Sequence, residues 1–177
     1  LKLPSGVRLT PMPDKNLNDM LLDGELDAVM SAHAIPAFQA GDPRVRRLLP
    51  DYQVEEAEYF RATGIFPIMH VVALRAELFE RHPWVAANLF RAFEEAKNRS
   101  VARALEATAS RFPIPWGSYH AERAVETFGE NYWPYGLEPN RHTLEQFLRF
   151  AHEQGVCRRP LTPEELFPES VRDLFKL

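Results

Sequence analysis

The sequence predicts an α/β protein whose C-terminal part is rich in helices. Residues 7–10 and 26–30 are short runs of strand length that contain valine, leucine and methionine, and the region between them has helical spacing. Residues 66–74 are almost wholly apolar, which is typical of a central strand buried on both faces. After residue 75, apolar residues recur every three or four positions, which indicates successive amphipathic helices.

The N-terminal elements follow one another closely. A strand is predicted over residues 7–10 and is ended by Pro11. A short helix over residues 17–21 follows a polar cap and stops at Gly24, and a second strand occupies residues 26–30. A strand, a helix and a strand in so few residues predict a unit of a parallel sheet.

The middle of the chain holds the predicted hinge and the central strand. Residues 31–50 have no apolar period and collect three prolines and a glycine, so we place a hinge or domain crossover there. A helix over residues 54–63 is expected to end at Gly64. The apolar run over residues 66–74 then follows as the central strand, with His70 in its middle.

Helices account for the remainder of the prediction. The longest opens at Pro83, a residue favoured at the first helical position, and Val85, Leu89 and Phe93 lie on its apolar stripe with Ala92 and Ala96. The other helices are expected over residues 77–81, 118–131, 141–154 and 163–167, and Asn140 is the predicted cap of the third of these.

Composition excludes several functional classes. The chain has 177 residues, is 45% hydrophobic and carries a dispersed net charge of -4, so a single core is expected and a nucleic-acid surface is not. Cys157 is the single cysteine, which excludes an intrachain disulfide and a thiolate zinc site and fits a reducing compartment. No apolar run approaches the roughly 20 residues of a membrane span. Because the sequence starts at Leu1, we expect the true start to be missing.

Two segments carry a resemblance to a known family. Residues 61–70 read RATGIFPIMH and run on to His-Pro-Trp at 82–84, and residues 132–142 read YWPYGLEPNRH. Together with GELDA at 24–28 and RRLLPDY at 46–52, they resemble the 4,5-dihydroxyphthalate decarboxylases and similar proteins. The resemblance implies the two-lobed fold of the type II periplasmic-binding proteins, with this chain as its C-terminal portion and the N-terminal half absent.

The resemblance also implies a domain division and a function. Residues 1–40 would complete the smaller inserted lobe with the hinge, and residues 41–177 would return to the first lobe. The implied function is a cytoplasmic, homo-oligomeric decarboxylase of hydroxylated aromatic dicarboxylates, acting by ring protonation on a small aromatic or organic anion. The alternative is a periplasmic solute-binding protein of an ABC transporter or sensor. No cofactor is predicted, and the use of a divalent metal is left open.

Histidines are the candidate catalytic residues, because the reaction needs a general acid near neutral pH. His70 lies inside the predicted central strand, where a histidine is expected to be buried and paired, so it is either catalytic or a satisfied core residue. His33 follows the strand over residues 26–30, at the end where open α/β sheets bind ligands, and is otherwise a solvated loop residue. Ser31 beside it is a candidate donor to a carboxylate.

The remaining candidates would bind substrate. Arg61 and Thr63 precede the apolar run and are placed to hold a carboxylate, although Arg61 is also a favoured helix-end charge. A polar and aromatic cluster is predicted chiefly to lock a proline- and glycine-rich loop onto the following helix, rather than to stack on a ring: Trp133, Tyr135, Asn140, Arg141 and His142. No metal, serine-hydrolase or phosphate-loop motif is found.

Overall fold

The computed structural model describes residues 3–174, and within them all regular structure is helical. The chain divides into two compact units. One comprises residues 5–56, and the other comprises residues 57–174 together with residues 3 and 4. The boundary between Glu56 and Ala57 falls inside the helix α3, Tyr52–Thr63. The division predicted at residue 40 stays a prediction.

The predicted α/β fold, and with it the type II periplasmic-binding-protein-like architecture, is wrong for the part of the chain that the structure describes. The three predicted strands, residues 7–10, 26–30 and 66–74, are irregular segments outside any ladder. A run of apolar residues becomes a buried strand only when neighbouring strands pair with its backbone and cover its faces. No such partner exists among residues 3–174, and Met30 and Met69 are accordingly 99% and 72% exposed.

The unit of residues 5–56 is held together around two short helices, α1 (Leu17–Leu22) and α2 (Pro36–Gln39). The Asn16 side chain caps α1 by accepting a hydrogen bond of 2.9 Å from the backbone N–H of Asp19. The Asn18 side chain accepts another, also 2.9 Å, from the backbone N–H of Ala37 at the start of α2. Met20 of α1 and Ala37 of α2 are the buried apolar residues of this unit.

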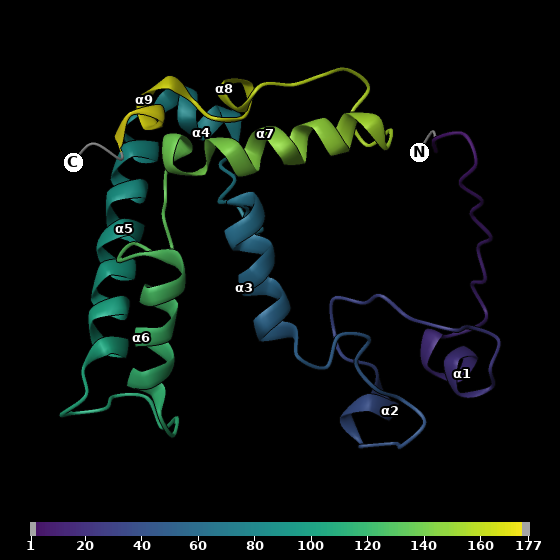
Figure 1. Ribbon diagram of the computed structural model, residues 1–177. Helices are drawn as coiled ribbons and strands as arrows, with labels where there is room; N and C mark the ends of the chain where they lie inside the picture. Colours follow the sequence, from purple (N-terminus) through teal and green to yellow (C-terminus); the bar gives the residue numbers. More distant parts are fainter. Residues whose placement is uncertain (1–2, 175–177) are drawn as a thin grey trace. The chain divides into compact units, whose positions relative to one another are not determined.

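The larger unit contains a pair of packed helices. The helices α3, α4 (Ala76–Arg81) and α5 (Trp84–Leu105) follow in order, and α6 (Gly117–Phe128) folds back along α5. Figure 1 shows α5 and α6 side by side over most of the length of α6. A small residue on each helix, Ala86 and Ala121, is buried, and a glycine at position 129 ends α6.

The helix α7 (Leu137–Glu153) supplies four buried apolar side chains. Its inner face carries Leu137, Leu144, Leu148 and Ala151. The helix α7 contacts the short helices α8 (Pro163–Leu166) and α9 (Glu169–Arg172), and Figure 1 shows α8 beside it. A capping box at the start of α8 and an Arg172 side chain that donates to two backbone carbonyls fix this C-terminal turn.

The helices were predicted more accurately than the strands. Every helix predicted after residue 50 is present, although α5 continues to Leu105 and α7 starts at Leu137. Pro139 is tolerated there because it lies in the first turn, where backbone N–H groups have no helical partner. The predicted cap at Asn140 is therefore wrong, since Gly136 holds the capping position. In residues 3–174, none of the helices combines the length and the apolarity that crossing a bilayer requires.

Candidate functional site

Two of the sequence-predicted residues lie in the unit of residues 5–56. Ser31 and His33 are exposed in an irregular segment after α1. The Ser31 hydroxyl accepts a hydrogen bond of 3.4 Å from the backbone N–H of His33, which forms a local turn. His33 is therefore a solvent-facing loop residue within its own unit, and its catalytic role stays a prediction.

Arg61 and Thr63 lie at the end of α3 in the larger unit. The Thr63 hydroxyl donates to the backbone carbonyl of Tyr59 at 2.7 Å and accepts from the backbone N–H of Ile65 at 3.2 Å, so it helps to end the helix. Gly64 then reverses the chain with a φ of 69°. Arg61 is exposed in the last turn of α3, where its charge suits the helix dipole and its guanidinium can reach an anion.

His70 is exposed, which contradicts the expectation of a buried and paired histidine. The expectation assumed a central strand, and the segment that holds His70 has no strand neighbours among the described residues. Val71 beside it is 66% exposed. An exposed imidazole can still exchange protons with a bound molecule or with water. The acid role of His70 therefore stays a prediction.

The structure brings the two segments that carry the family resemblance into contact. The His142 ring donates from Nε2 to the backbone carbonyl of Thr63 at 2.9 Å. The Phe66 ring meets the edge of the Trp133 ring at a centroid distance of 5.8 Å and that of Phe128 at 4.9 Å. The start of the 66–74 segment is thereby anchored beside the loop that precedes α7.

The loop before α7 is locked to that helix, as the sequence predicted. The Asn140 amide donates two hydrogen bonds of 2.9 Å, to the backbone carbonyls of Pro134 and Gly136. Both bonds hold the loop backbone against the first turn of α7. The locking role predicted for Asn140 is confirmed, and it fixes Trp133 and Tyr135 in place on either side of Pro134.

Arg141 joins α7 to α8 through carboxylates. Its guanidinium contacts Glu138 and lies 2.6 Å from Glu164 Oε1 and 3.6 Å from Glu145 Oε1. The hydrogen bonds from Arg141 hold the pKa values of Glu138 and Glu164 below the ordinary glutamate value. With its donors directed at protein carboxylates, Arg141 has a structural role and is not an anchor for a substrate.

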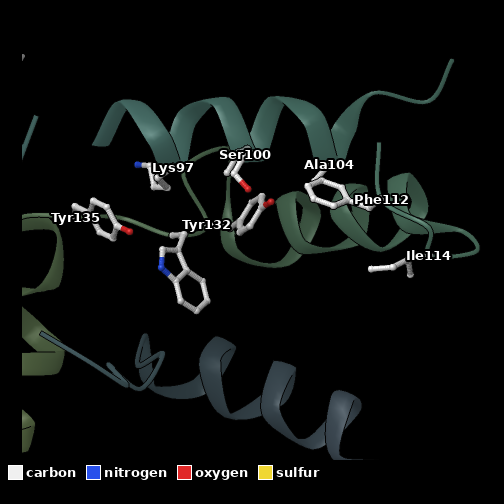
Figure 2. A pocket seen from close by; sticks show the side chains of 9 residues that line it. Lys97, Ser100, Ala104, Phe112, Ile114, Tyr132 and Tyr135 are labelled. Carbon is white, nitrogen blue, oxygen red and sulfur yellow. The ribbon is translucent and has the colours of Figure 1, made fainter. Parts of the chain in front are cut away.

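A cavity of about 500 Å³ opens between α5, the loop that joins α5 to α6 and the loop before α7. We call it the α5–α6 cavity; Figure 2 shows Lys97 and Tyr135 at one end of it and Phe112 and Ile114 at the other. Its volume lies within the range of small-molecule sites. The lining combines one cation with aromatic and aliphatic side chains: Lys97, Ser100, Val101, Ala104, Phe112, Ile114, Tyr132, Trp133 and Tyr135.

Lys97 is the buried charge of the α5–α6 cavity. It is 8% exposed, and its ammonium donates to Glu94 Oε1 at 2.6 Å and to the Asn131 side-chain oxygen at 3.0 Å. The ammonium also lies 5.4 Å from the centre of the Tyr135 ring. The second oxygen of Glu94 is buried and has no hydrogen-bond partner among the described residues.

The sequence contained a signal for Lys97 that the prediction did not use. Lys97 lies four residues after Phe93 and four before Val101, in a helix read as amphipathic. The predicted stripe included Ala92, Phe93 and Ala96, all of which are exposed. The packed face is rotated toward Ala86, Lys97 and Val101, so a lysine lies where a core residue was expected.

No metal site accompanies these residues in the part of the chain that the structure describes. Among residues 3–174, no three histidine, cysteine, aspartate or glutamate side chains gather closely enough to hold an ion. Cys157 is a partly exposed thiol, and the His152 ring beside it faces the Cys157 carbonyl at 3.3 Å. The exposed histidine and arginine side chains can take part in proton transfer and anion binding.

Comparison with known proteins identifies relatives of a single kind. The chain is 35% identical to the 4,5-dihydroxyphthalate decarboxylase of Comamonas testosteroni over 178 aligned residues, which cover 100% of this chain and 54% of that protein. It is 40% identical to the 4,5-dihydroxyphthalate decarboxylase of Pseudomonas putida over 63 residues, which cover 35% of this chain and 24% of that protein. The chain thus spans about half the length of the Comamonas protein. No family model matches it.

Proposed function

Because this chain is related over its whole length to the 4,5-dihydroxyphthalate decarboxylases, as its sequence predicted, we propose that its gene product is a decarboxylase of hydroxylated aromatic dicarboxylates. The observation that carries the proposal is the 35% identity along all of the chain, which includes both segments that meet through Thr63 and His142. The substrate class follows from the relatives, whose activity both names state.

The proposed reaction needs no oxidant or reductant. A proton adds to the ring carbon that bears one carboxylate, which gives a dearomatised intermediate. The bond to that carboxylate then breaks, carbon dioxide leaves, and the electron pair of the bond restores the aromatic ring, so 4,5-dihydroxyphthalate would give 3,4-dihydroxybenzoate. A ring hydroxyl para to the reacting carbon stabilises the dearomatised intermediate, and a base that withdraws its proton strengthens this effect.

The described residues offer groups for each step. His70 and His33 are exposed imidazoles that can carry a proton near neutral pH, and they remain our candidates for the general acid and base. Arg61 is an exposed guanidinium suited to a carboxylate, and Ser31 stays a predicted donor within its own unit. Thr63 keeps a candidate role in binding, although its hydroxyl already makes two local hydrogen bonds.

The solute-receptor alternative has less support than the enzyme, because both relatives found are named decarboxylases. We propose that the enzyme acts in the cytoplasm on a small aromatic anion; no cofactor is predicted, and the use of a divalent metal is left open. Exposed apolar side chains at Met69, Val71 and Val72 support its assembly as a homo-oligomer, because water-facing patches of this kind favour association.

The test is carbon dioxide release from 4,5-dihydroxyphthalate by the full-length gene product. We expect release by the parent and a loss of about 100-fold or more in a His70→Asn variant, which keeps size and polarity but removes the titrating ring. His120→Asn is the matched control, because His120 is an exposed histidine of α6 outside the candidate set. Equal activity of the parent and His70→Asn would remove His70 from the mechanism, and no release by the parent would refute the proposed function.

A further inference from the structure

The α5–α6 cavity has a polar end that is incompletely satisfied. A lysine ammonium carries three N–H groups, and Lys97 directs two of them at Glu94 and Asn131. The ammonium also faces the Tyr135 ring, and the second oxygen of Glu94 is buried without a hydrogen-bond partner among the described residues. The Lys97 side chain lines the cavity, so an acceptor on a molecule that enters can compete with Glu94 for this ammonium. An acceptor of negative charge forms the strongest bond with an ammonium.

The other walls favour a flat ring. Tyr132, Trp133 and Tyr135 contribute three aromatic rings, and the apolar side chains of Phe112 and Ile114 line the far end (Figure 2). The Trp133 ring is held by its edge contact with Phe66 and by the locked loop, so this wall is preorganised. Ser100 and Tyr132 add hydroxyl groups that can pair with polar substituents on a ring.

We propose that the α5–α6 cavity is a binding site for a hydroxylated aromatic carboxylate, with Lys97 as the anchor of its carboxylate. The carboxylate lies at the polar end beside Lys97, and the ring lies among Tyr132, Trp133 and Tyr135. This inference rests on the proposed function for the choice of an aromatic acid. Its anchor, Lys97, is not among the sequence-predicted candidates, whereas Trp133 and Tyr135 belong to the predicted polar and aromatic cluster.

Glu94 sets the strength of this site. Its carboxylate neutralises Lys97 at 2.6 Å and competes with any acid that enters. Removal of the Glu94 charge should therefore tighten the binding of an aromatic acid, whereas removal of the Lys97 charge should weaken it. A purely structural ion pair predicts no such opposition, because breaking it from either side would merely destabilise the fold.

The test is a calorimetric titration of the full-length gene product with 3,4-dihydroxybenzoate, which lacks the second carboxylate and is not consumed in the proposed reaction. We expect Lys97→Met to bind about 10- to 100-fold more weakly, as the loss of a charge-assisted hydrogen bond implies. Glu94→Gln should bind several-fold more tightly. Lys15→Met is the matched control, because Lys15 is exposed and pairs with Glu25 in the other unit.

A steric variant keeps the test decisive if Lys97→Met fails to fold. Ala104→Phe fills the apolar end of the α5–α6 cavity without touching the ion pair, and it should abolish binding while the helical circular dichroism is retained. Cyclohexanecarboxylate should bind more weakly than benzoate to the parent. Unchanged affinity in Lys97→Met or in folded Ala104→Phe would overturn the inference. Lys97-dependent binding without carbon dioxide release would refute the proposed function and leave the binding site in place.

Discussion

Replacement of Asn140 by alanine should loosen the loop that carries Trp133 and Tyr135. The variant loses two hydrogen bonds of 2.9 Å and leaves the carbonyls of Pro134 and Gly136 without this donor. Each such bond contributes about 0.5–1.5 kcal/mol, so the loss is about 1–3 kcal/mol. Alanine has a higher helix propensity than asparagine, which offsets up to about 0.7 kcal/mol of this loss. We therefore expect a net loss of about 1–2 kcal/mol in the free energy of unfolding.

Urea unfolding followed by circular dichroism measures this difference. The midpoint should fall while the slope with denaturant stays the same. Asn98→Ala is the matched control, because Asn98 is exposed in the middle of α5 and reports the helix propensity alone. If Asn140→Ala were as stable as Asn98→Ala, the two hydrogen bonds would not hold the loop, and the reasoning would be refuted.

Two further predictions concern the same unit. Gly64→Ala should lower the free energy of unfolding by about 1 kcal/mol, because Gly64 has a φ of 69°, which alanine rarely adopts. Gly117→Ala at the start of α6 should not lower it, and the urea midpoints of both variants test this difference. Acid should weaken the attachment of α8 to α7, because Arg141 holds the pKa values of Glu138 and Glu164 below 4.5. The contribution of both carboxylates to the free energy of unfolding is therefore full above pH 4.5 and is lost as the pH falls through the lowered pKa values. The urea midpoint between about pH 5 and pH 3 should accordingly fall less in Arg141→Ala, and an equal fall would count against this ion-pair network.

The helices could be predicted from the sequence because their signals are local. Apolar spacing located α6 and α7 to within a few residues. The strands failed because pairing is a property of two segments, and the apolar run over residues 66–74 carries no information on whether a partner lies beside it. The expectation that His70 is buried failed with it.

The candidate site was predicted in part. The prolines and glycine around Tyr135 marked a structured loop, and Asn140 locks it as expected. Lys97 was missed because its burial depends on which face of α5 meets α6, and a rotation of that face by a fraction of a turn exchanges exposed and buried positions. A lysine on the apolar side of a long helix was the available signal.

The most direct test of the proposed function follows the fate of the ring carbon. The full-length gene product is incubated with 4,5-dihydroxyphthalate in deuterated water, and the products are resolved by nuclear magnetic resonance. The account predicts 3,4-dihydroxybenzoate with one deuterium on the ring carbon ortho to the remaining carboxylate, formed together with an equal amount of carbon dioxide. Tight binding of the diacid with no new product would contradict the account and identify a binding protein instead.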